Sequence, residues 1–446
     1  MAEQTSSQYE RMTQGRIAPL IIKLAIPTTL SMLMTSVYNL ADTAFVGTLG
    51  TSASGAVGVV FGYMSIIQAV GFMVGMGSGS IVSRALGARR QDEANAVVST
   101  GFALALAAGV ALAVLSFIFI DPLVRVMGST ETIAPFAKTY ISYILFAAPF
   151  MTATFTMNQV LRFEGRAVLG MVGMMTGGLL NIVGDAVFIF GFDMGIAGAG
   201  LSTCLSQIVS FCILLAMFLT GKSASKLNPR YVRLDAATIS DICATGFPSL
   251  LRQGLTSYTT MLLNQQSAPY GDAAIAAMSI VGRIAFFVFS IALGVGQGFQ
   301  PVCAFNYGAR KYDRVRNAFR STMVICEILM IVFVTILLLF SGNLIQVFRD
   351  DPEVIAIGTR ALRVQGLGVL ILPITMVVEM LYQSSGRKVG ATVISAMRGG
   401  ILFIPAILIL AHFRGLYGIE EAQAVAYFLS IPPALLYARR FFDDLP

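Results

Sequence analysis

Long apolar stretches separated by short polar breaks recur along the whole chain. Five of the stretches contain no Asp, Glu, Lys or Arg, namely residues 43–83, 94–120, 139–161, 194–221 and 284–309. A helix that crosses a bilayer needs about 20 apolar residues, whereas strands of outer-membrane barrels alternate over about ten residues. The length and continuity of these stretches therefore predict membrane-spanning α-helices.

The breaks between apolar stretches predict an all-α integral membrane protein with twelve transmembrane helices. We expect these helices near residues 17–44, 54–82, 97–120, 136–160, 167–190, 196–220, 239–266, 274–300, 321–341, 357–382, 389–412 and 418–438. The hydrophilic segment 221–238 separates the first six helices from the last six. The expected organisation is a tail (1–16), an amino-terminal lobe (17–220), a linker (221–238), a carboxyl-terminal lobe (239–438) and a second tail (439–446).

Composition supports a membrane protein and argues against several other classes. Hydrophobic residues make up 56% of the chain and charged residues 12%, against about 25% charged residues in soluble domains. The five cysteines show no paired spacing, and His412 is the only histidine. We therefore expect no disulfide framework, no metal centre and no cofactor, and an enzyme is disfavoured because no catalytic motif is present. The polar first sixteen residues predict no removable signal peptide.

The basic residues predict the orientation of the helices. If both termini and every even-numbered loop share one side, that side carries 20 of the 30 Lys and Arg residues and the opposite side carries 6. Cytoplasmic loops are enriched in Lys and Arg, so we expect both termini to be cytoplasmic and the protein to lie in the cytoplasmic (inner) membrane. This topology accounts for the isoelectric point of about 9.2 without a nucleic-acid partner.

An internal repeat divides the chain into two halves. Pro27 lies 221 residues before Pro248, and the same offset relates Gly87-Ala-Arg89 to Gly308-Ala-Arg310. Six helices per half is an even number, so the halves are expected to be parallel repeats. Transporters are commonly built from such repeats, with the substrate bound near the middle of the membrane.

Polar residues on the predicted helices mark a candidate site in the first half. Ionisable residues inside a membrane are expensive and indicate function by default. Asp42 follows Thr35, Tyr38 and Asn39 at helical spacing, and Asp185 follows Met174 and Asn181 in the fifth helix; Asn158 lies in the fourth. The repeat places Leu263 and Ala406 at the positions of the two acids, so the carboxylate pair belongs to one lobe only. The alternative is that Asp42 only caps its helix at the outer interface.

The second half carries its own charged residues. Arg252, Arg283, Glu379 and Arg398 fall within its helices. One interpretation is mutual neutralisation, with Glu379 paired to Arg252 or Arg398; the other is a direct role of Arg252 and Glu379 in coupling or in substrate contact. Pro27 removes a backbone hydrogen bond from the first helix and is expected to act as a hinge.

These features together resemble the multidrug and toxic-compound extrusion (MATE) family, in its prokaryotic DinF-like or MepA-like branch. The resemblance rests on the two six-helix lobes, on Pro27 with Tyr38-Asn39-x-x-Asp42, on Asn181-x-x-x-Asp185, and on Ser83-Arg-Ala-Leu-Gly87 with Asn306-Tyr-Gly308. It implies a V-shaped cleft between the lobes. It also implies a cation site formed by Asp42, Asn181, Asp185 and Thr203. Where some branches carry an acid in the seventh helix, this chain has Arg252 and Gln253, which argues against coupling there.

The expected function is secondary active multidrug efflux by alternating access. Amphipathic or cationic compounds would leave in exchange for H⁺ or Na⁺, with any sodium held at the four cation-site residues. The expected substrate-contacting residues are Thr35, Tyr38, Asn39, Asn158, Met174, Glu379 and Arg252. Membrane lipid and small amphipathic molecules are the expected partners, and the expected oligomeric state is a monomer. The alternative is a lipid-linked oligosaccharide flippase, which would need a basic cavity supplied by Arg252, Arg283 and Arg398.

Overall fold

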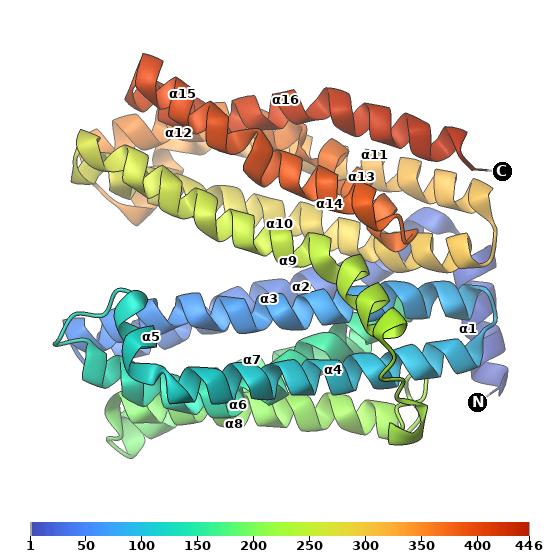
Figure 1. Cartoon of the computed structure of the whole chain (residues 1–446). Coiled ribbons are helices and arrows are strands. Elements are labelled where there is room, and N and C mark those ends of the chain that lie inside the picture. Colours follow the sequence, from blue (N-terminus) through green and yellow to red (C-terminus); the bar gives the residue numbers. More distant parts are fainter. Residues whose placement is uncertain (1, 446) are drawn as a thin grey trace. The chain divides into compact units, whose positions relative to one another are not determined.

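The computed structural model describes residues 2–445, with side chains from residue 8 onward, and every regular element in this range is helical. Figure 1 shows long helices that run roughly parallel to one another within each half of the chain. The first half contains α1 (Ala2–Gln14), α2 (Ile17–Gly47), α3 (Thr51–Gly87), α4 (Gln91–Ile118), α5 (Ile120–Val126), α6 (Ala134–Phe163), α7 (Ala167–Asp185), the π-helix η1 (Ala186–Gly191) and α8 (Gly195–Leu219). The second contains α9 (Ala236–Ser267), α10 (Asp272–Gly308), α11 (Tyr312–Phe348), α12 (Pro352–Leu370), α13 (Leu372–Ser384), α14 (Lys388–Ala396), the π-helix η4 (Met397–Ile401), α15 (Phe403–Arg414) and α16 (Leu416–Asp443). Two short 3₁₀ turns, η2 (Pro229–Tyr231) and η3 (Ala268–Tyr270), complete the described chain.

Most of the long helices are apolar enough to span a membrane. Within the described residues, nine helices meet the requirement of length and hydropathy, counting α7 with η1 and α14 with η4 and α15 as single spans. The pair α12 and α13 meets it together across a 44° bend. Helices α9 and α16 have the length of a span but carry more polar residues. The predicted all-α membrane fold is confirmed.

The internal repeat is visible in the backbone. Helices α3 and α10 are both 37 residues long and begin at Thr51 and Asp272, at the 221-residue spacing that the sequence predicts. Corresponding non-glycine residues after these helices, Arg89 and Arg310, adopt left-handed backbone angles of 59° and 57° in φ. Such angles are uncommon for non-glycine residues, so their recurrence shows that the turns as well as the helices are duplicated.

The chain folds into two compact units, and α2 and α9 each contribute to both. Unit 1 comprises Met1–Gln14 and Leu30–Leu250, and unit 2 comprises Gly15–Thr29 and Leu251–Pro446. The boundary within α2 therefore falls two residues after Pro27, and the boundary within α9 falls two residues after Pro248. Both prolines lie inside their helices, where a proline removes a main-chain hydrogen bond and weakens the local backbone. The first half of each helix thus packs in the unit opposite to its second half.

Glycines at equivalent positions of the repeat let the first halves of α9 and α2 pack closely in units 1 and 2. A Cβ atom built on Gly77 of α3 would lie 2.0 Å from the carbonyl oxygen of Ile242 in α9. A Cβ atom on Gly298 of α10 would lie 2.8 Å from the carbonyl oxygen of Ile21 in α2. Small residues let membrane helices approach closely, and here the same repeat position does so once in each unit.

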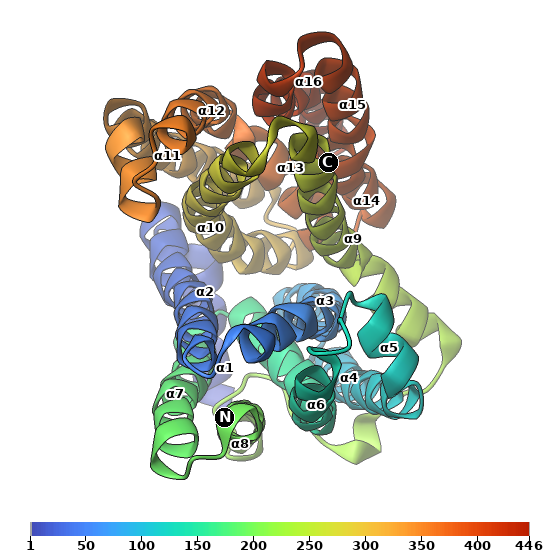
Figure 2. The same cartoon turned by 90° about the vertical axis from the view of Figure 1, so that its left-hand side faces the viewer.

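Helix α6 forms the centre of unit 1. Its side chains Tyr140, Ile141, Ile144 and Leu145 are fully or almost fully buried, and α6 packs against α3, α4, α7 and α8. Figure 2 shows these helices grouped around α6 when they are viewed along their length. Neighbouring helices cover most of α6, so its buried polar groups lie in the interior of unit 1, where the candidate site lies.

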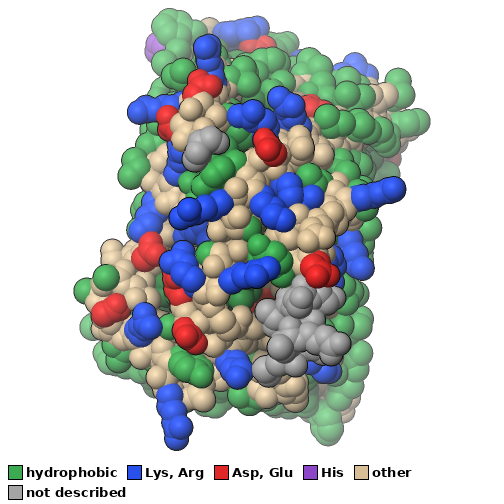
Figure 3. Space-filling view, turned by 90° about the vertical axis from the view of Figure 1, so that its right-hand side faces the viewer, with side chains coloured by type: hydrophobic (Ala, Val, Ile, Leu, Met, Phe, Trp, Pro, Cys, Tyr) green, Lys and Arg blue, Asp and Glu red, His purple; other side chains and the backbone are tan. Residues whose placement is uncertain are grey.

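The basic residues gather at one end of each unit, which we call the basic end. Figure 3 shows the abundant Lys and Arg side chains on this face of the molecule. In unit 1 the guanidinium group of Arg89 lies 4.4 Å from the ring centre of Tyr9 in α1. In unit 2 the guanidinium group of Arg387 pairs with Asp444 at 2.8 Å. Helix α1, from the amino-terminal tail, and the carboxyl-terminal end of α16 therefore pack at the basic ends of their units.

The linker after α8 is held on unit 1 by Glu164, which sequence analysis did not identify. The Glu164 carboxylate is fully buried at the end of α6 and accepts hydrogen bonds from Ser223 Oγ at 2.8 Å, from the amide of Ala224 at 2.8 Å, and from the amide and hydroxyl of Ser225. Burial raises the pKa of this carboxyl, while the bonds from the linker oppose the shift. The carbonyl of Glu164 accepts a further bond from Gln8 of α1. One side chain thereby fixes the linker to the basic end of unit 1.

Candidate cation site in unit 1

Asp42 and Asp185 lie in the interior of unit 1. The Asp42 residue is 6% exposed and Asp185 is fully buried. Asp42 projects from the second half of α2, and Asp185 is the last residue of α7, directly before the π-helix η1. The two carboxylates lie close enough for their charges to repel each other. The structure therefore disagrees with the alternative in which Asp42 only caps its helix at the surface.

A tyrosine from α6 satisfies one oxygen of Asp42. The Tyr140 hydroxyl donates a hydrogen bond of 2.8 Å to Oδ2 of Asp42. Tyr140 is fully buried, and it lies within electrostatic range of both Asp42 and Asp185. A proton or cation bound at either acid would therefore change the electrostatic environment of the Tyr140 hydroxyl.

Asn181 connects α7 to α8. Its side-chain amide donates to Thr203 Oγ1 at 3.1 Å and, more weakly, to Ser202 Oγ at 3.4 Å and to Oδ1 of Asp185 at 3.5 Å. In return Ser202 Oγ donates to the Asn181 carbonyl at 2.9 Å. Asn181 thus holds α7 and α8 together and places its side chain beside Asp185.

Three oxygen atoms at this site have no hydrogen-bond partner within the described residues. They are Oδ1 of Asp42, Oδ2 of Asp185 and Oδ1 of Asn181, and all are buried. Buried polar atoms normally have a partner, so these atoms mark the place where a proton or a cation would bind. Oxygen atoms are the ligands that hard cations take. Only two carboxylates take part, and the described residues contain no group of three His, Cys, Asp or Glu side chains that could hold a transition metal.

Small residues on α7 bring the helices together around the site. A Cβ atom on Gly178 would lie 3.0–3.2 Å from Met34 and Tyr38 of α2. A Cβ atom on Gly184 would lie 2.5 Å from Ser202 Oγ of α8. The π-helix η1 then widens the backbone immediately after Asp185, and π-helical turns are frequent at functional sites. Helix α7 thus packs closely against α2 and α8 before Asp185, and its backbone widens just after Asp185.

The structure joins the four predicted cation-site residues and adds two that sequence analysis did not single out for this site. Tyr140 lies in an apolar stretch, and a buried tyrosine hydroxyl usually finds a polar partner; this was the available signal. Ser202 is one of several polar residues on α8, and nothing in the sequence distinguishes it from the others. No sequence motif links either residue to Asp42, because they come together only when α6 and α8 pack against α2 and α7.

The predicted substrate-contacting residues fall in both units. Thr35, Tyr38, Asn39, Asn158 and Met174 belong to unit 1, and Arg252 and Glu379 belong to unit 2. Tyr38 is buried one turn before Asp42 on α2, and Met174 is buried on α7, whereas Thr35, Asn39 and Asn158 are partly exposed. Asn158 lies against α7, where a Cβ atom on Gly170 would be 2.7 Å from its amide nitrogen.

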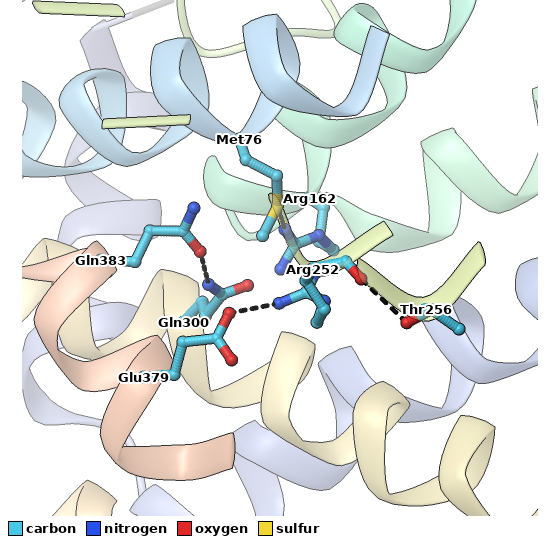
Figure 4. A network of polar contacts seen from close by, with 7 residues as sticks. All are labelled: Met76, Arg162, Arg252, Thr256, Gln300, Glu379 and Gln383. Atoms are coloured by element: carbon cyan, nitrogen blue, oxygen red, sulfur yellow. Dashed lines mark hydrogen bonds and ion pairs between the residues drawn. The ribbon is translucent and has the colours of Figure 1, made fainter. Parts of the chain in front are cut away.

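In unit 2 Glu379 pairs with Arg252. Nη1 of Arg252 lies 2.7 Å from Oε1 of Glu379, and the two side chains are 10% and 2% exposed. Beside this pair the amide of Gln300 donates to Gln383 at 3.0 Å, as Figure 4 shows. Of the two partners that sequence analysis left open for Glu379, the structure therefore shows Arg252.

Comparison with known proteins agrees with this architecture. The MatE family profile matches residues 27–187 and 248–409. The multidrug export protein MepA of Staphylococcus saprophyticus is 26% identical over 426 residues, which cover 95% of this chain and 94% of that protein. A solved structure described as the outward-facing conformation of a multidrug resistance MATE family transporter of the MOP superfamily superposes with a TM-score of 0.92 at 25% identity and 98% coverage of both chains. A second, described as MATE in the bent conformation, gives a TM-score of 0.93 at the same identity and coverage.

The fold and the buried acids of unit 1 define a multi-pass membrane transporter built from two six-helix repeats. The family match covers well over half of the chain and starts at Pro27 in one repeat and at Pro248 in the other. The chain belongs to the MATE family, in its MepA-like branch.

Proposed function

We propose that this chain is a secondary active multidrug efflux antiporter. It would export amphipathic, often cationic compounds in exchange for H⁺ or Na⁺ by alternating access. The observation that carries the proposal is the buried pair Asp42 and Asp185, with three oxygen atoms that lack hydrogen-bond partners among the described residues. The MepA relatives, whose names describe multidrug export, support the substrate class.

The chemistry of the site fits cation coupling. Two carboxylates that repel each other in a low-dielectric interior bind a proton or a cation more readily than isolated surface acids do. Tyr140 and Asn181 hold one oxygen of each acid by hydrogen bonds and leave the other oxygen for the coupling ion. A proton would bind one carboxylate, whereas sodium would also draw on Asn181 Oδ1 and Thr203 Oγ1.

Cation binding would be linked to movement through α2. This helix carries Asp42 in unit 1 and Pro27 in the segment that belongs to unit 2. Neutralising the acids removes their repulsion and lets α2 pack differently against α7. We propose that the weakened backbone at Pro27 acts as the hinge for this change. Substrate contacts would come from Thr35, Tyr38, Asn39, Asn158 and Met174 in unit 1 and from Arg252 and Glu379 in unit 2.

The basic ends define the proposed topology. Because Lys and Arg are enriched in cytoplasmic loops, we assign the basic ends, the linker and both termini to the cytoplasm and the protein to the cytoplasmic (inner) membrane. The proposed working form is a monomer in lipid, without a cofactor.

The test is transport in sodium-free proteoliposomes under an imposed pH gradient, with a panel of cationic dyes. Wild type is expected to move the dyes, and Asp42→Asn and Asp185→Asn are each expected to lower the rate by about tenfold or more, because each removes one of the two buried carboxylates that would bind the coupling ion. Glu131→Gln, at an exposed acid in the loop before α6, is the matched control and should transport normally. A requirement for sodium would keep the site and identify the ion. Absence of dye movement with either ion would contradict the proposal.

Lipid-linked oligosaccharide flipping is less well supported. It would require several free basic groups, yet Glu379 neutralises Arg252 and Arg283 is exposed on α10. Of these three arginines, Arg398 is the one that is buried without an ion pair among the described residues.

A further inference from the structure

Arg398 is a buried cation in the interior of unit 2 that the proposed coupling mechanism does not use. The residue is 7% exposed and lies in the π-helix η4. Its Nη1 atom has no hydrogen-bond partner within residues 8–445. The guanidinium carbon lies 5.5 Å from the ring centre of Phe289 in α10.

The acids of unit 2 are engaged elsewhere. Glu379 pairs with Arg252 at 2.7 Å, and Glu420 accepts two hydrogen bonds of 2.6 Å from Arg360. Glu421 pairs with Arg414, and Glu327 is only partly buried on α11. A charge buried in a membrane is costly unless it is paired. The cost of burying Arg398 is therefore not offset by any ion pair that the structure shows.

The surroundings of Arg398 combine apolar and aromatic surface with this single cationic group. Gly399 and Gly400 follow Arg398, and a Cβ atom on Gly400 would lie 3.1 Å from Leu255 of α9. Phe289 covers one side, and Tyr427 of α16 lies within electrostatic range of the guanidinium group. Binding sites for small molecules are typically apolar and aromatic, with a few polar groups that fix the orientation of the ligand. A guanidinium group is suited to oxyanions because its N–H donors match the geometry of a carboxylate.

We propose that Arg398 binds the carboxylate of those amphipathic substrates that carry one. This inference rests on the proposed function and names the residue that would recognise an acidic group on the substrate. Unit 1 supplies acids for the coupling cation, and unit 2 supplies a base for an acidic group on the transported molecule. Binding the carboxylate would give the buried guanidinium group the partner that it lacks in unit 2.

The test compares a matched pair of dyes, tetramethylrhodamine, which carries a carboxylate, and its methyl ester, which does not. Equilibrium binding is measured by fluorescence polarisation on the full chain in phosphatidylcholine nanodiscs. Arg398→Gln is expected to weaken binding of the acid roughly tenfold or more, as expected when a hydrogen bond to a charged group is lost, and to leave binding of the ester unchanged. Arg398→Lys should retain part of the preference. Arg283→Gln, at an exposed arginine of the same unit, should behave like wild type.

A stability measurement separates ligand binding from a structural role. If Arg398 serves a ligand, removing its uncompensated charge should leave the melting temperature of the ligand-free protein unchanged or raise it. A fall of several degrees with equal loss of both dyes would identify a structural arginine and overturn the inference. Unchanged binding of the acid to Arg398→Gln would also overturn it, while binding of the ester would still support multidrug efflux. If neither dye binds to wild type, both proposals fail.

A further measurement with an anionic lipid tests whether other oxyanions bind at the site. Nanodiscs that contain phosphatidylglycerol offer a phosphate in place of the carboxylate. Competition with the acid dye in wild type, absent in Arg398→Gln, would support an oxyanion site that the lipid phosphate shares. Competition of the same size in both proteins would place the lipid effect elsewhere, and the inference would then rest on the dye pair in phosphatidylcholine alone.

Discussion

The two units share one backbone plan but place opposite charges at its centre. In unit 1 the fifth helix of the repeat ends at Asp185 and continues into the π-helix η1. In unit 2 the fifth helix of the repeat is α14, which continues into the π-helix η4 with Arg398 inside it. Both charged residues are buried. A π-helical segment in the same helix of each repeat therefore follows a buried acid in one unit and contains a buried arginine in the other.

This difference indicates that the duplicated scaffold and the functional groups are under separate constraints. The turns at Arg89 and Arg310 and the close approaches at Gly77 and Gly298 recur because helix packing requires them in both units. The charges do not recur, because packing does not require them.

The largest expected effect is a difference in the free energy of unfolding between variants of the two buried charged sites. Glu379→Gln leaves Arg252 buried without its partner, and breaking a buried ion pair costs about 3–5 kcal/mol. Asp185→Asn instead removes one of two carboxylates that repel each other, so the free energy of unfolding should stay the same or increase. Thermal unfolding of both variants in the same detergent measures the contrast.

The double variant Arg252→Met with Glu379→Met is the control for this prediction. It removes both charges of the pair, and well-packed apolar replacements of a buried ion pair are often neutral or stabilising. Its melting temperature should therefore lie well above that of Glu379→Gln. If Asp185→Asn were destabilised as strongly as Glu379→Gln, the acids of unit 1 would be structural and the contrast between the units would disappear.

An intermediate effect is expected for the tyrosine that serves only the unit 1 site. Tyr140→Phe removes the donor to Asp42 and leaves a buried carboxylate oxygen without its partner, which costs about 1–3 kcal/mol. Transport should fall several-fold while the protein still folds. Thermal unfolding and dye transport in proteoliposomes check the two parts, with Tyr143→Phe on the neighbouring turn of α6 as the control. Unchanged transport in Tyr140→Phe would show that the phenol takes no part in coupling.

The smallest expected effect concerns the linker at the basic end of unit 1. Because burial raises the pKa of Glu164, the folded linker binds the proton of this carboxyl more tightly than the unfolded chain does. The contribution of Glu164 to linker stability is therefore complete in acid and is lost as the pH rises through its raised folded pKa. Hydrogen exchange at the amides of Ala224 and Ser225, corrected for intrinsic rates, should show less protection at the higher pH.

Glu164→Gln removes the titrating group and should abolish this pH dependence. The variant also separates Glu164 from the other acids at the same end of the unit, the exposed Asp92 and the partly exposed Glu93. Protection that increases with pH in wild type would mean that the hydrogen bonds to the ionised carboxylate outweigh the cost of burying it.

Much of the fold could be predicted because its signals are local or periodic. Uncharged apolar stretches predict the helices, and the 221-residue offset predicts the duplication down to the first residues of α3 and α10. Asp42 and Asp185 could be found because a carboxylate in an apolar helix is conspicuous by itself. Tyr140 and Glu164 could not be assigned their roles, because neither residue is unusual in its own segment. Their partners come from 98 and about 60 residues away along the chain.

The sequence alone therefore determined the membrane environment, the helices, the repeat and the positions of the charged residues, since each depends on composition or on spacing along one chain. Only the tertiary structure decided which polar and charged groups meet: Tyr140 with Asp42, Asn181 with Thr203, and Glu379 with Arg252 instead of Arg398. It also assigned the first halves of α2 and α9 to opposite units. The physical reason is that pairing energies depend on distances between side chains from different helices, and helix packing sets those distances.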